Sequence, residues 1–407
     1  MDSRSNQVAV TGIGVISPFG RGFPALSSGL LECRSCLKPL TIFDSGLDPQ
    51  PVVAQIRELP DVGDHPGFRL SRTDRLAVIA ALDAAQAAGD CNDFLEAGAI
   101  IATTVAGLTE IGPAIAADPA RYYRAGGFAS AASYPASHPA EAVGAWLGLR
   151  GPCWGVSVAC ASGAMAIALA ANRVLAGDAP MMLAGGSDAL AAFTLSGFNS
   201  LRALDPEPCR PFDINRNGLN LGEGAAVFVL ESLDHARAQH ANVFALLRGW
   251  AMTNDAFHPT APDEQGRGLA HSIQSAMAMA GVDADAVGYV NAHGTGTPLN
   301  DIAEVKAYET AFRGRSSPIP VSSTKSFFGH CLGGAGALEA AVTIAGMHSS
   351  ALFPTLRLTD PIESAAVDWL MGKPRRQPLP VAMTVSAGFG GSNTSLVFEL
   401  PGKSDEA

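Results

Sequence analysis

The residue with the clearest chemical potential is Cys160, which lies in residues 156–164 (VSVACASGA). An apolar run with β-branched residues leads into it, and a run of small residues follows it to about Ala176. No charged residue occurs between Arg150 and Arg173, so the pattern predicts a buried strand, a sharp turn and a buried helix that begins just after the cysteine. A thiol at a helix N-terminus is favoured as a thiolate, the nucleophile that accepts acyl groups. The backbone N–H groups at the same corner can bind the oxyanion that forms when a thioester is attacked.

Two other interpretations of this stretch exist. A single cysteine in apolar surroundings is also typical of an inert core residue, and residues 155–171 are apolar enough to resemble a short membrane span. The stretch is, however, rich in Gly, Ala and Ser, includes the polar Ser157 and Ser162, and ends at Asn172 and Arg173. These features favour a helix packed between two sheets.

Three more segments place polar groups in apolar surroundings, and residues 290–298 (VNAHGTGTP) are the first of them. A predicted strand delivers His293 to its end, and the glycines allow a ligand to approach the backbone closely. Thr295 and Thr297 add hydroxyl donors. An ordinary polar turn is the alternative, and the Lys-Ser/Thr pair of a phosphate-binding loop is missing.

The second segment, residues 322–336 (SSTKSFFGHCLGGAG), carries Lys325 and His330 on either side of two aromatic residues. A glycine-rich stretch then leads into a buried helix. A lysine in such an apolar segment calls for a buried partner, and Glu339 further along that helix can supply it.

The third segment, residues 386–393 (SAGFGGSN), places Phe389 among glycines. This composition suits a flexible loop that presents or withholds one side chain, although a tight loop between two closing strands is the simpler interpretation. Together the segments combine a thiol at a strand-to-helix corner, two histidines on separate loops, and a Lys/Glu pair.

Composition limits the class of protein that holds these groups. Of 407 residues, 47% are hydrophobic and only 16% charged, so the core is large relative to the surface. The net charge of −11 argues against nucleic-acid binding. Seven cysteines without a framework favour a reducing cytoplasm, and the polar start of the chain shows no signal or transit peptide.

Strands and helices alternate in two halves, which we place at residues 1–241 and 242–407, each with a small-residue helix in its middle. This alternation predicts parallel sheets covered by helices. The predicted strands are 7–14, 97–104, 151–159, 181–186, 225–230, 244–252, 287–291, 382–387 and 394–399, and the predicted helices are 23–31, 71–89, 139–147, 161–176, 268–279, 301–310 and 334–347. Residues 36–66 are expected to be irregular.

At these motifs the sequence resembles the β-ketoacyl synthases, condensing enzymes of the thiolase-like fold. The resemblance runs from residues 8–20 (VAVTGIGVISPFG) to residues 388–400 and includes NAHGTGTPLND and TKSFFGHCLGGAGALE in order. It implies an α/β fold with a five-layered α-β-α-β-α architecture made of two pseudo-repeated halves. The sequence is most similar to the stand-alone elongating (type II) synthases, because it contains no fused carrier or acyltransferase segment.

The resemblance also implies a role for each motif residue. Cys160 would hold the acyl chain as a thioester, and His293 and His330 would hydrogen-bond the thioester oxygen of the incoming malonyl carrier. Lys325 and Glu339 would hold the histidines in place. Phe389 would supply one oxyanion N–H and act as a gate. Further expected roles are phosphopantetheine binding (Thr295, Thr297), acyl-pocket lining (Val105, Phe198), a structural monovalent cation (Asn291, Glu339, Ser386) and docking of an acidic carrier protein (Arg69, Arg72, Arg202).

The implied partners are an acyl carrier protein and a second subunit, in a homodimer or in a heterodimer with a chain-length-factor-like chain; no cofactor, nucleic acid or membrane span is expected. The usual Arg-Asp-Gly-Phe turn reads Arg216-Asn217-Gly218-Leu219 here, which leaves open which carrier, which acyl chain, and whether the pathway is primary fatty-acid synthesis or a specialised polyketide or polyene route. A non-catalytic chain-length-factor-like subunit is disfavoured by Cys160. A degradative thiolase is disfavoured because no cysteine follows Cys331.

Overall fold

A large mixed sheet runs through the computed structural model, which describes residues 7–89, 94–110 and 135–402. Within these residues twelve strands are joined, in the order β13-β11-β10-β15-β16-β9-β1-β8-β7-β5-β6, with β2 paired to β1. Their bounds are β1 Val8–Ser17, β2 Gly20–Arg21, β5 Gly98–Ala102, β6 Cys153–Val156, β7 Met181–Asp188, β8 Gly224–Ser232, β9 Ala245–Asn254, β10 Val290–Asn291, β11 Ile319–Ser322, β13 Val367–Trp369, β15 Val381–Gly388 and β16 Ser392–Glu399.

The strand order reveals the predicted pseudo-repeat. From β1 outward the order is β1-β8-β7-β5-β6, and from β9 outward it is β9-β16-β15-β10-β11. In each half the sheet therefore runs from the first strand of that half to its last and next-to-last strands, and then to the strands that follow the first one in the chain. The halves meet where β1 pairs with β9. The expectation of parallel sheets is only partly right: the outer strands are parallel, whereas the pairs from β7 through β8, β1, β9 and β16 to β15 are antiparallel. Apolar runs predict burial on both faces but do not fix strand direction.

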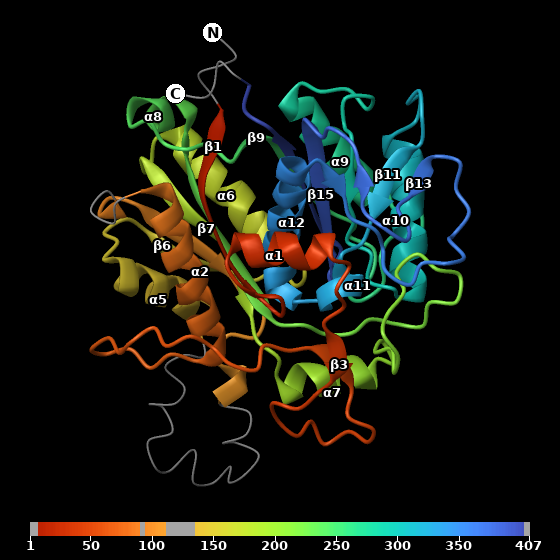
Figure 1. The fold of residues 1–407 in the computed structure, drawn as a ribbon, viewed down its shortest axis with the longest axis horizontal. Coiled ribbons are helices and arrows are strands. Elements are labelled where there is room, and N and C mark those ends of the chain that lie inside the picture. Colours follow the sequence, from red (N-terminus) through yellow and green to blue (C-terminus); the bar gives the residue numbers. More distant parts are fainter. Residues whose placement is uncertain (1–6, 90–93, 111–134, 403–407) are drawn as a thin grey trace.

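Helices cover and separate the two halves of the sheet, which gives the five layers that Figure 1 shows from left to right. The first outer layer is α2 (Arg72–Ala88) with α5 (His138–Leu147), and the last is α9 (Arg267–Ala280) with α10 (Pro298–Ala311). Between the two halves lie α6 (Ser162–Ala176) and α12 (Ala335–Ser349), which contact strands of both. The architecture predicted from the sequence is therefore confirmed.

The two central helices cross at glycines. A Cβ atom at Gly163 of α6 would lie 2.8 Å from the Ala337 nitrogen, and one at Gly336 of α12 would lie 2.7 Å from the Ala164 nitrogen. Side chains at these positions would force the helices apart. The close crossing brings the N-terminus of α6, which follows Cys160, beside the N-terminus of α12, which follows His330.

The remaining elements are short, and the sequence analysis did not predict most of them. Residues 36–66 are not wholly irregular, because β3 (Leu37–Pro39) and β4 (Val52–Ala54) pair as an antiparallel hairpin, and α7 (Ala192–Ser200) had not been predicted. In contrast, α1 has the predicted bounds Phe23–Leu31, and Ser71 caps α2 in a capping box with Asp74. The other elements are α8 Leu233–Ala238, α11 Lys325–Phe328, the 3-10 turn η3 Leu332–Gly334, β12 Ala351–Leu352 and β14 Arg375–Arg376.

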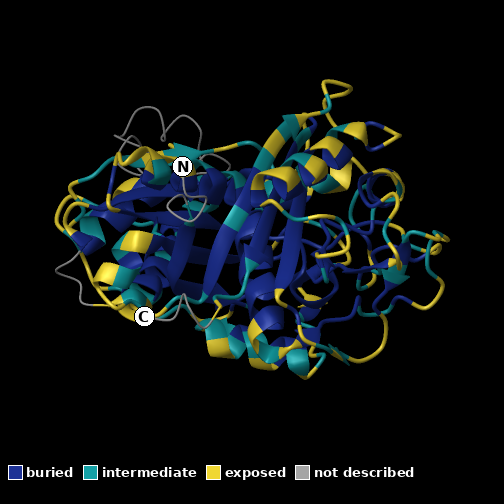
Figure 2. Cartoon of the chain, turned by 90° about the horizontal axis from the view of Figure 1, so that it is seen from above, coloured by how far each residue is buried: buried dark blue, intermediate teal, exposed yellow. Residues whose placement is uncertain are grey.

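Burial follows these layers, as Figure 2 shows: the strands are buried and exposed residues lie mainly on the outer helices and loops. In the described part of the chain one helical stretch, Ala159–Ala176, is long and apolar enough by composition to cross a membrane, and 61% of it is buried inside the protein. Its contacts with both sheet halves are those of a core helix.

Candidate active site

Cys160 lies at the corner between β6 and α6, where the chain turns from the sheet into a central helix. Ala159 adopts a φ of +52°. The hydroxyl of Ser162 accepts a hydrogen bond from the Val158 N–H at 2.8 Å and donates one to the Ala159 carbonyl. These contacts fix a tight turn immediately before α6 and leave Cys160 8% exposed, on the wall of a cavity.

Gly388, the last residue of β15, packs against this corner. A Cβ atom at Gly388 would lie 3.0 Å from the Cys160 nitrogen and 3.2 Å from the Ala161 nitrogen. Glycine therefore keeps open a space in front of these amides, at the distance where an N–H donor holds an oxyanion.

Burial opposes ionisation of the Cys160 thiol. It raises the pKa of the thiol to about 12, an effect larger than the lowering caused by nearby Lys325. Desolvation therefore acts against the thiolate that we expected at this helix N-terminus.

His293 follows β10, and its backbone is hydrogen-bonded to a carboxylate of α10. The side chain of Glu304 accepts hydrogen bonds from the N–H groups of His293 and Gly294, both at 2.7 Å, and from the hydroxyl of Tyr308. Burial raises the pKa of Glu304 to about 7. These bonds fix the loop backbone and leave the imidazole free to face the cavity.

His330 lies between α11 and η3, and its tautomer is set by the backbone. Its Nδ1 accepts the N–H of Leu332 at 3.2 Å, so the proton of the neutral ring is on Nε2. The rings of His293 and His330 lie edge to face with centroids 5.3 Å apart. Both side chains are buried and line the same cavity as Cys160.

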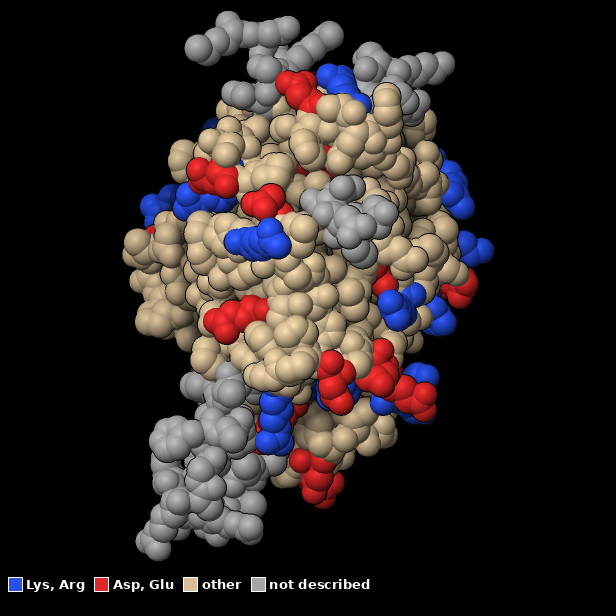
Figure 3. Space-filling view, turned by 90° about the vertical axis from the view of Figure 1, so that its left-hand side faces the viewer, with Lys and Arg blue, Asp and Glu red and all other residues tan. Residues whose placement is uncertain are grey.

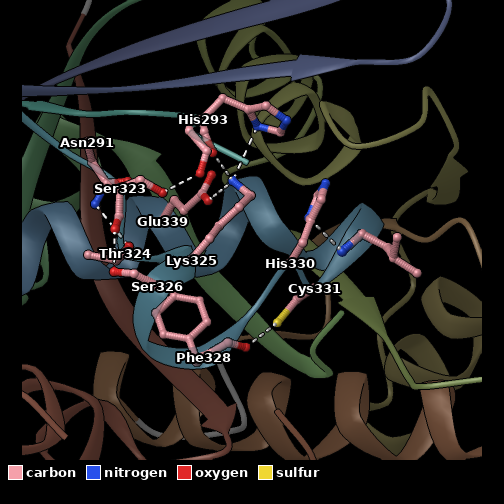
Figure 4. Close-up of polar contacts among 12 residues, drawn as sticks. Asn291, His293, Ser323, Thr324, Lys325, Ser326, Phe328, His330, Cys331 and Glu339 are labelled. Atoms are coloured by element: carbon pink, nitrogen blue, oxygen red, sulfur yellow. Dashed lines mark hydrogen bonds and ion pairs between the residues drawn. The ribbon is translucent and has the colours of Figure 1, made fainter. Parts of the chain in front are cut away.

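Lys325 and Glu339 form a buried ion pair behind the histidines, as Figure 4 shows. The ammonium of Lys325, whose side chain is 1% exposed, also donates to the His293 carbonyl at 2.6 Å and lies 3.3 Å from His293 Nδ1. An ammonium is only a donor, so it makes Nδ1 of His293 an acceptor and places the ring proton on Nε2.

Both imidazoles are neutral. Burial, and then the positive charge of Lys325, lower the pKa of His293 and of His330 well below the ordinary value. Each ring thus offers an Nε2–H donor without carrying charge of its own, which suits stabilisation of negative charge that develops on a substrate oxygen.

The cavity has a volume of about 360 Å³ and joins groups from both halves of the chain. The side chains of Thr295 and Thr297 lie in it with their hydroxyls 2.8 Å apart. Phe389, 39% exposed, stacks on Phe198 at 5.9 Å between ring centroids. The residues lining it are Cys160, Phe198, Leu201, Arg202, Ala203, Leu219, Asp255, Thr260, Ala261, Pro262, His293, Thr295, Thr297, Pro298, Leu299, Asn300, His330, Ala387, Gly388, Phe389 and Asn393.

The residues predicted to line the acyl pocket and those predicted to dock the carrier protein are only partly brought together. Val105 is buried in an apolar cluster that Phe198 packs against, but the cavity lining includes only Phe198. Arg69 and Arg202 are exposed. Arg72, in contrast, is the counterion of the fully buried Glu223, with a contact of 2.7 Å, which makes it a poor docking residue.

Sequence reasoning missed the buried carboxylates that position the site, namely Glu304, described above, Asp188 and Asp301. Asp188, at the end of β7, accepts the N–H groups of Val105 at 2.9 Å and Gly333 at 2.6 Å, and so links the first half of the chain to the loop that carries His330. Asp301 accepts those of Phe212 at 2.7 Å and Gly296 at 3.2 Å. Asp188 could have been found from the sequence, because it is an acidic residue at the end of an apolar strand.

Three buried oxygens coincide with the predicted cation ligands. Within the described residues, Asn291 Oδ1, Glu339 Oε2 and Ser386 Oγ have no hydrogen-bond partner. Unsatisfied buried oxygens are costly unless something coordinates them, and oxygen donors suit hard cations. The residues present therefore fit a small cation.

Comparison with known proteins identifies the class. The sequence models for the N-terminal and C-terminal domains of β-ketoacyl synthases match residues 5–236 and 244–359. The chain is similar to Nodulation protein E of Rhizobium sp. (strain N33), at 34% identity over 98% of this chain and 99% of that protein. It is similar to 3-oxoacyl-(acyl-carrier-protein) synthase 2 of Synechocystis sp., at 34% identity over 97% and 98%. Among solved structures, the ishigamide ketosynthase/chain length factor has a TM-score of 0.89 at 28% identity, covering 98% of this chain and 100% of that one.

The chain belongs to the β-ketoacyl synthase family. It is a condensing enzyme of the acyltransferase type, built on the thiolase-like fold.

Proposed function

We propose that the protein extends an acyl chain on Cys160 by two carbons, through decarboxylative condensation with a malonyl group held on a carrier protein. The observation that carries the proposal is that Cys160 lines one cavity with two neutral imidazoles, His293 and His330. The name of the 3-oxoacyl-(acyl-carrier-protein) synthase 2 relative supports a carrier-bound substrate.

In the first half-reaction, the Cys160 sulfur attacks the carbonyl of an acyl thioester. A new thioester forms on Cys160, the bond to the phosphopantetheine sulfur breaks, and the thiol proton passes to that leaving sulfur. The space kept open by Gly388 supports an oxyanion site at the amide of Cys160, and we assign the second N–H of this site to Phe389.

In the second half-reaction, the two Nε2–H groups donate to the thioester oxygen of the malonyl group. Loss of CO₂ leaves an enolate whose charge lies on that oxygen, where two aimed donors in a dry site stabilise it. The carbanion attacks the acyl carbonyl, the Cys160–acyl bond breaks, and the Cys160 thiolate takes up a proton. Lys325 and Glu339 act as positioning residues for this step.

The cavity mouth supports roles for the other predicted residues. Thr295 and Thr297 would hydrogen-bond the phosphopantetheine arm, a role supported by their position in the cavity lining. Phe389 is the gate, since the two glycines that follow it, Gly390 and Gly391, have φ of +82° and +78° and form a backbone that can re-arrange. Phe198 and Val105 limit the acyl chain.

The docking proposal rests on Arg69 and Arg202, because Arg72 is occupied by Glu223. We also propose a structural monovalent cation at Asn291, Glu339 and Ser386, where it would satisfy three oxygens without entering the reaction. The six described cysteines are free thiols, which supports a cytoplasmic location. No other cofactor is part of the proposal.

A second subunit is proposed at the edge of the sheet formed by β6, where Trp154 is 40% exposed. The face of the molecule on this side is mostly uncharged, with its charges scattered (Figure 3). The similarity to the ishigamide ketosynthase/chain length factor supports a second candidate, the active subunit of such a heterodimer. A stable dimer of this chain alone, measured by light scattering, would favour the homodimer.

The central experiment replaces Cys160 by Ala and measures both 3-oxoacyl product and CO₂ release from malonyl carrier. We expect no condensation and retained decarboxylation, because the histidines remain. Cys33→Ala, which changes a thiol outside the cavity, is the control. Undiminished condensation by the Cys160 variant would end the proposal.

A further inference from the structure

A second cavity, of about 440 Å³, lies between the turn after β1, the segment after α1, and the hairpin of β3 and β4. It shares no lining residue with the active-site cavity. Its volume is within the range of small-molecule sites, roughly 300–1,000 Å³. The lining residues are Ser17, Pro18, Phe19, Gly20, Arg34, Ser35, Cys36, Lys38, Gln55, Ile56 and Arg57.

The charge of this cavity is opposite to that of the chain. Arg34, Lys38 and Arg57 line it, and no carboxylate is among its described lining residues, whereas the whole chain has a net charge of −11. The positive charges of Arg34 and Lys38 both lie close to Cys36. Burial raises the pKa of Cys36 to about 11, and each of these two charges lowers it. Like charges gathered in one concavity repel one another, and a multivalent anion relieves that repulsion.

Two of these cations are available to a ligand. Within the described residues, the side chains of Lys38 and Arg57 form no hydrogen bond or ion pair. Arg34 lies 5.4 Å above the ring of Phe19 and 4.0 Å from the exposed carboxylate of Glu32, so its guanidinium is oriented but only weakly neutralised. Two guanidinium forks and one ammonium are the donors that bind phosphate groups.

The cavity also lies directly behind a catalytic segment. Its floor, Phe19, contacts Phe327 and Phe328 of α11 edge to face, at 6.5 Å and 6.0 Å. The Cys36 N–H donates to the Phe327 carbonyl at 2.8 Å, and Figure 1 places β3 beneath α11, with which it is in contact. The helix α11 begins with Lys325, so the aromatic residues that contact Phe19 and the active-site lysine belong to the same short helix.

We propose that this basic cavity binds a small molecule carrying two or more phosphate groups, at a site separate from the active site. The proposal does not rest on the condensation reaction, because binding is measured without turnover.

Isothermal titration of the full chain with inorganic pyrophosphate tests it. We expect saturable binding at one site per chain. The double variant Lys38→Gln/Arg57→Gln should weaken the affinity about tenfold or more, since it removes two charged donors. Arg313→Gln, which changes an exposed arginine outside the cavity, should leave the affinity unchanged.

Both altered residues are exposed, so the double variant should unfold at the same urea concentration as the wild type. Absence of pyrophosphate binding would overturn the proposal. Binding that the double variant leaves unchanged would overturn the location, and citrate binding as tightly as pyrophosphate would overturn the assignment to phosphate.

Discussion

Replacing Gly388 by Ala should disable the oxyanion site without disturbing the fold. The added Cβ atom would lie 3.0 Å from the Cys160 nitrogen and 3.2 Å from the Ala161 nitrogen. In the proposed mechanism the oxyanion lies in this space, about 2.7–3.1 Å from its N–H donors. The methyl group therefore displaces the charge from at least one donor, and loss of one such donor costs roughly 10²–10³ in turnover, or about 2.7–4 kcal/mol of transition-state stabilisation.

The two half-reactions separate this effect from misfolding. Intact-protein mass spectrometry should show slow acylation of Cys160, and condensation should fall roughly 100-fold or more. Decarboxylation of malonyl carrier should persist, because it depends on His293 and His330. Gly197→Ala is the control, since a Cβ atom there meets nothing within 4 Å. Condensation within about threefold of the wild type, less than one oxyanion donor contributes, would refute the reasoning, and so would an equal loss of decarboxylation.

The other two predictions concern buried charges. Glu339→Gln removes the counterion of the Lys325 ammonium, which should lower the free energy of unfolding by about 3–5 kcal/mol. Adding Lys325→Met should restore roughly half of that loss, as measured by urea unfolding. Equal losses in the single and double variants would contradict the pairing. Burial raises the folded-state pKa of Glu304 from 4.5 to about 7, so its protonated form contributes stability that is fully present below the unfolded pKa and is lost as pH rises through about 7. Glu304→Gln should remove a pH-dependent difference of roughly 3 kcal/mol, at about 1.36 kcal/mol per pH unit, and parallel stability curves of variant and wild type from about pH 4.5 to about pH 8 would argue against it.

The layers of the fold could be predicted because their signals are local. Apolar runs flanked by glycines predicted most strands, and the small-residue runs after Cys160 and around Gly336 predicted helices that pack closely. Strand direction could not be predicted in the same way, since a strand buried on both faces has the same apolar composition whether its neighbours are parallel or antiparallel. The hairpin of β3 and β4 was missed because each strand has only three residues.

The cysteine and the two histidines that line the cavity could be predicted because such residues are conspicuous in apolar segments. The carboxylates that hold them could not. On α10, Asp301 and Glu304 are buried, while Leu299 is 61% exposed and Ile302 47% exposed. The first turns of this helix therefore bury two acids and expose two aliphatic side chains, which locally reverses the pattern that amphipathic periodicity normally predicts. The two acids are buried because they accept hydrogen bonds from loop N–H groups. The sequence does not show which backbone groups lack partners, so it could not predict this burial.

Those carboxylates explain how loops can be as rigid as an active site requires. The glycine-rich loops that carry His293 and His330 have N–H groups with no partner in a helix or sheet, and buried orphan amides are costly. Glu304 accepts two of them, from His293 and Gly294 at 2.7 Å, and Asp188 accepts one, from Gly333 at 2.6 Å. Charged acceptors make the stronger hydrogen bonds, which offsets part of the cost of burying the carboxylate. The loop backbone is thus held by carboxylates, and in the proposed mechanism each imidazole keeps its Nε2–H for the substrate.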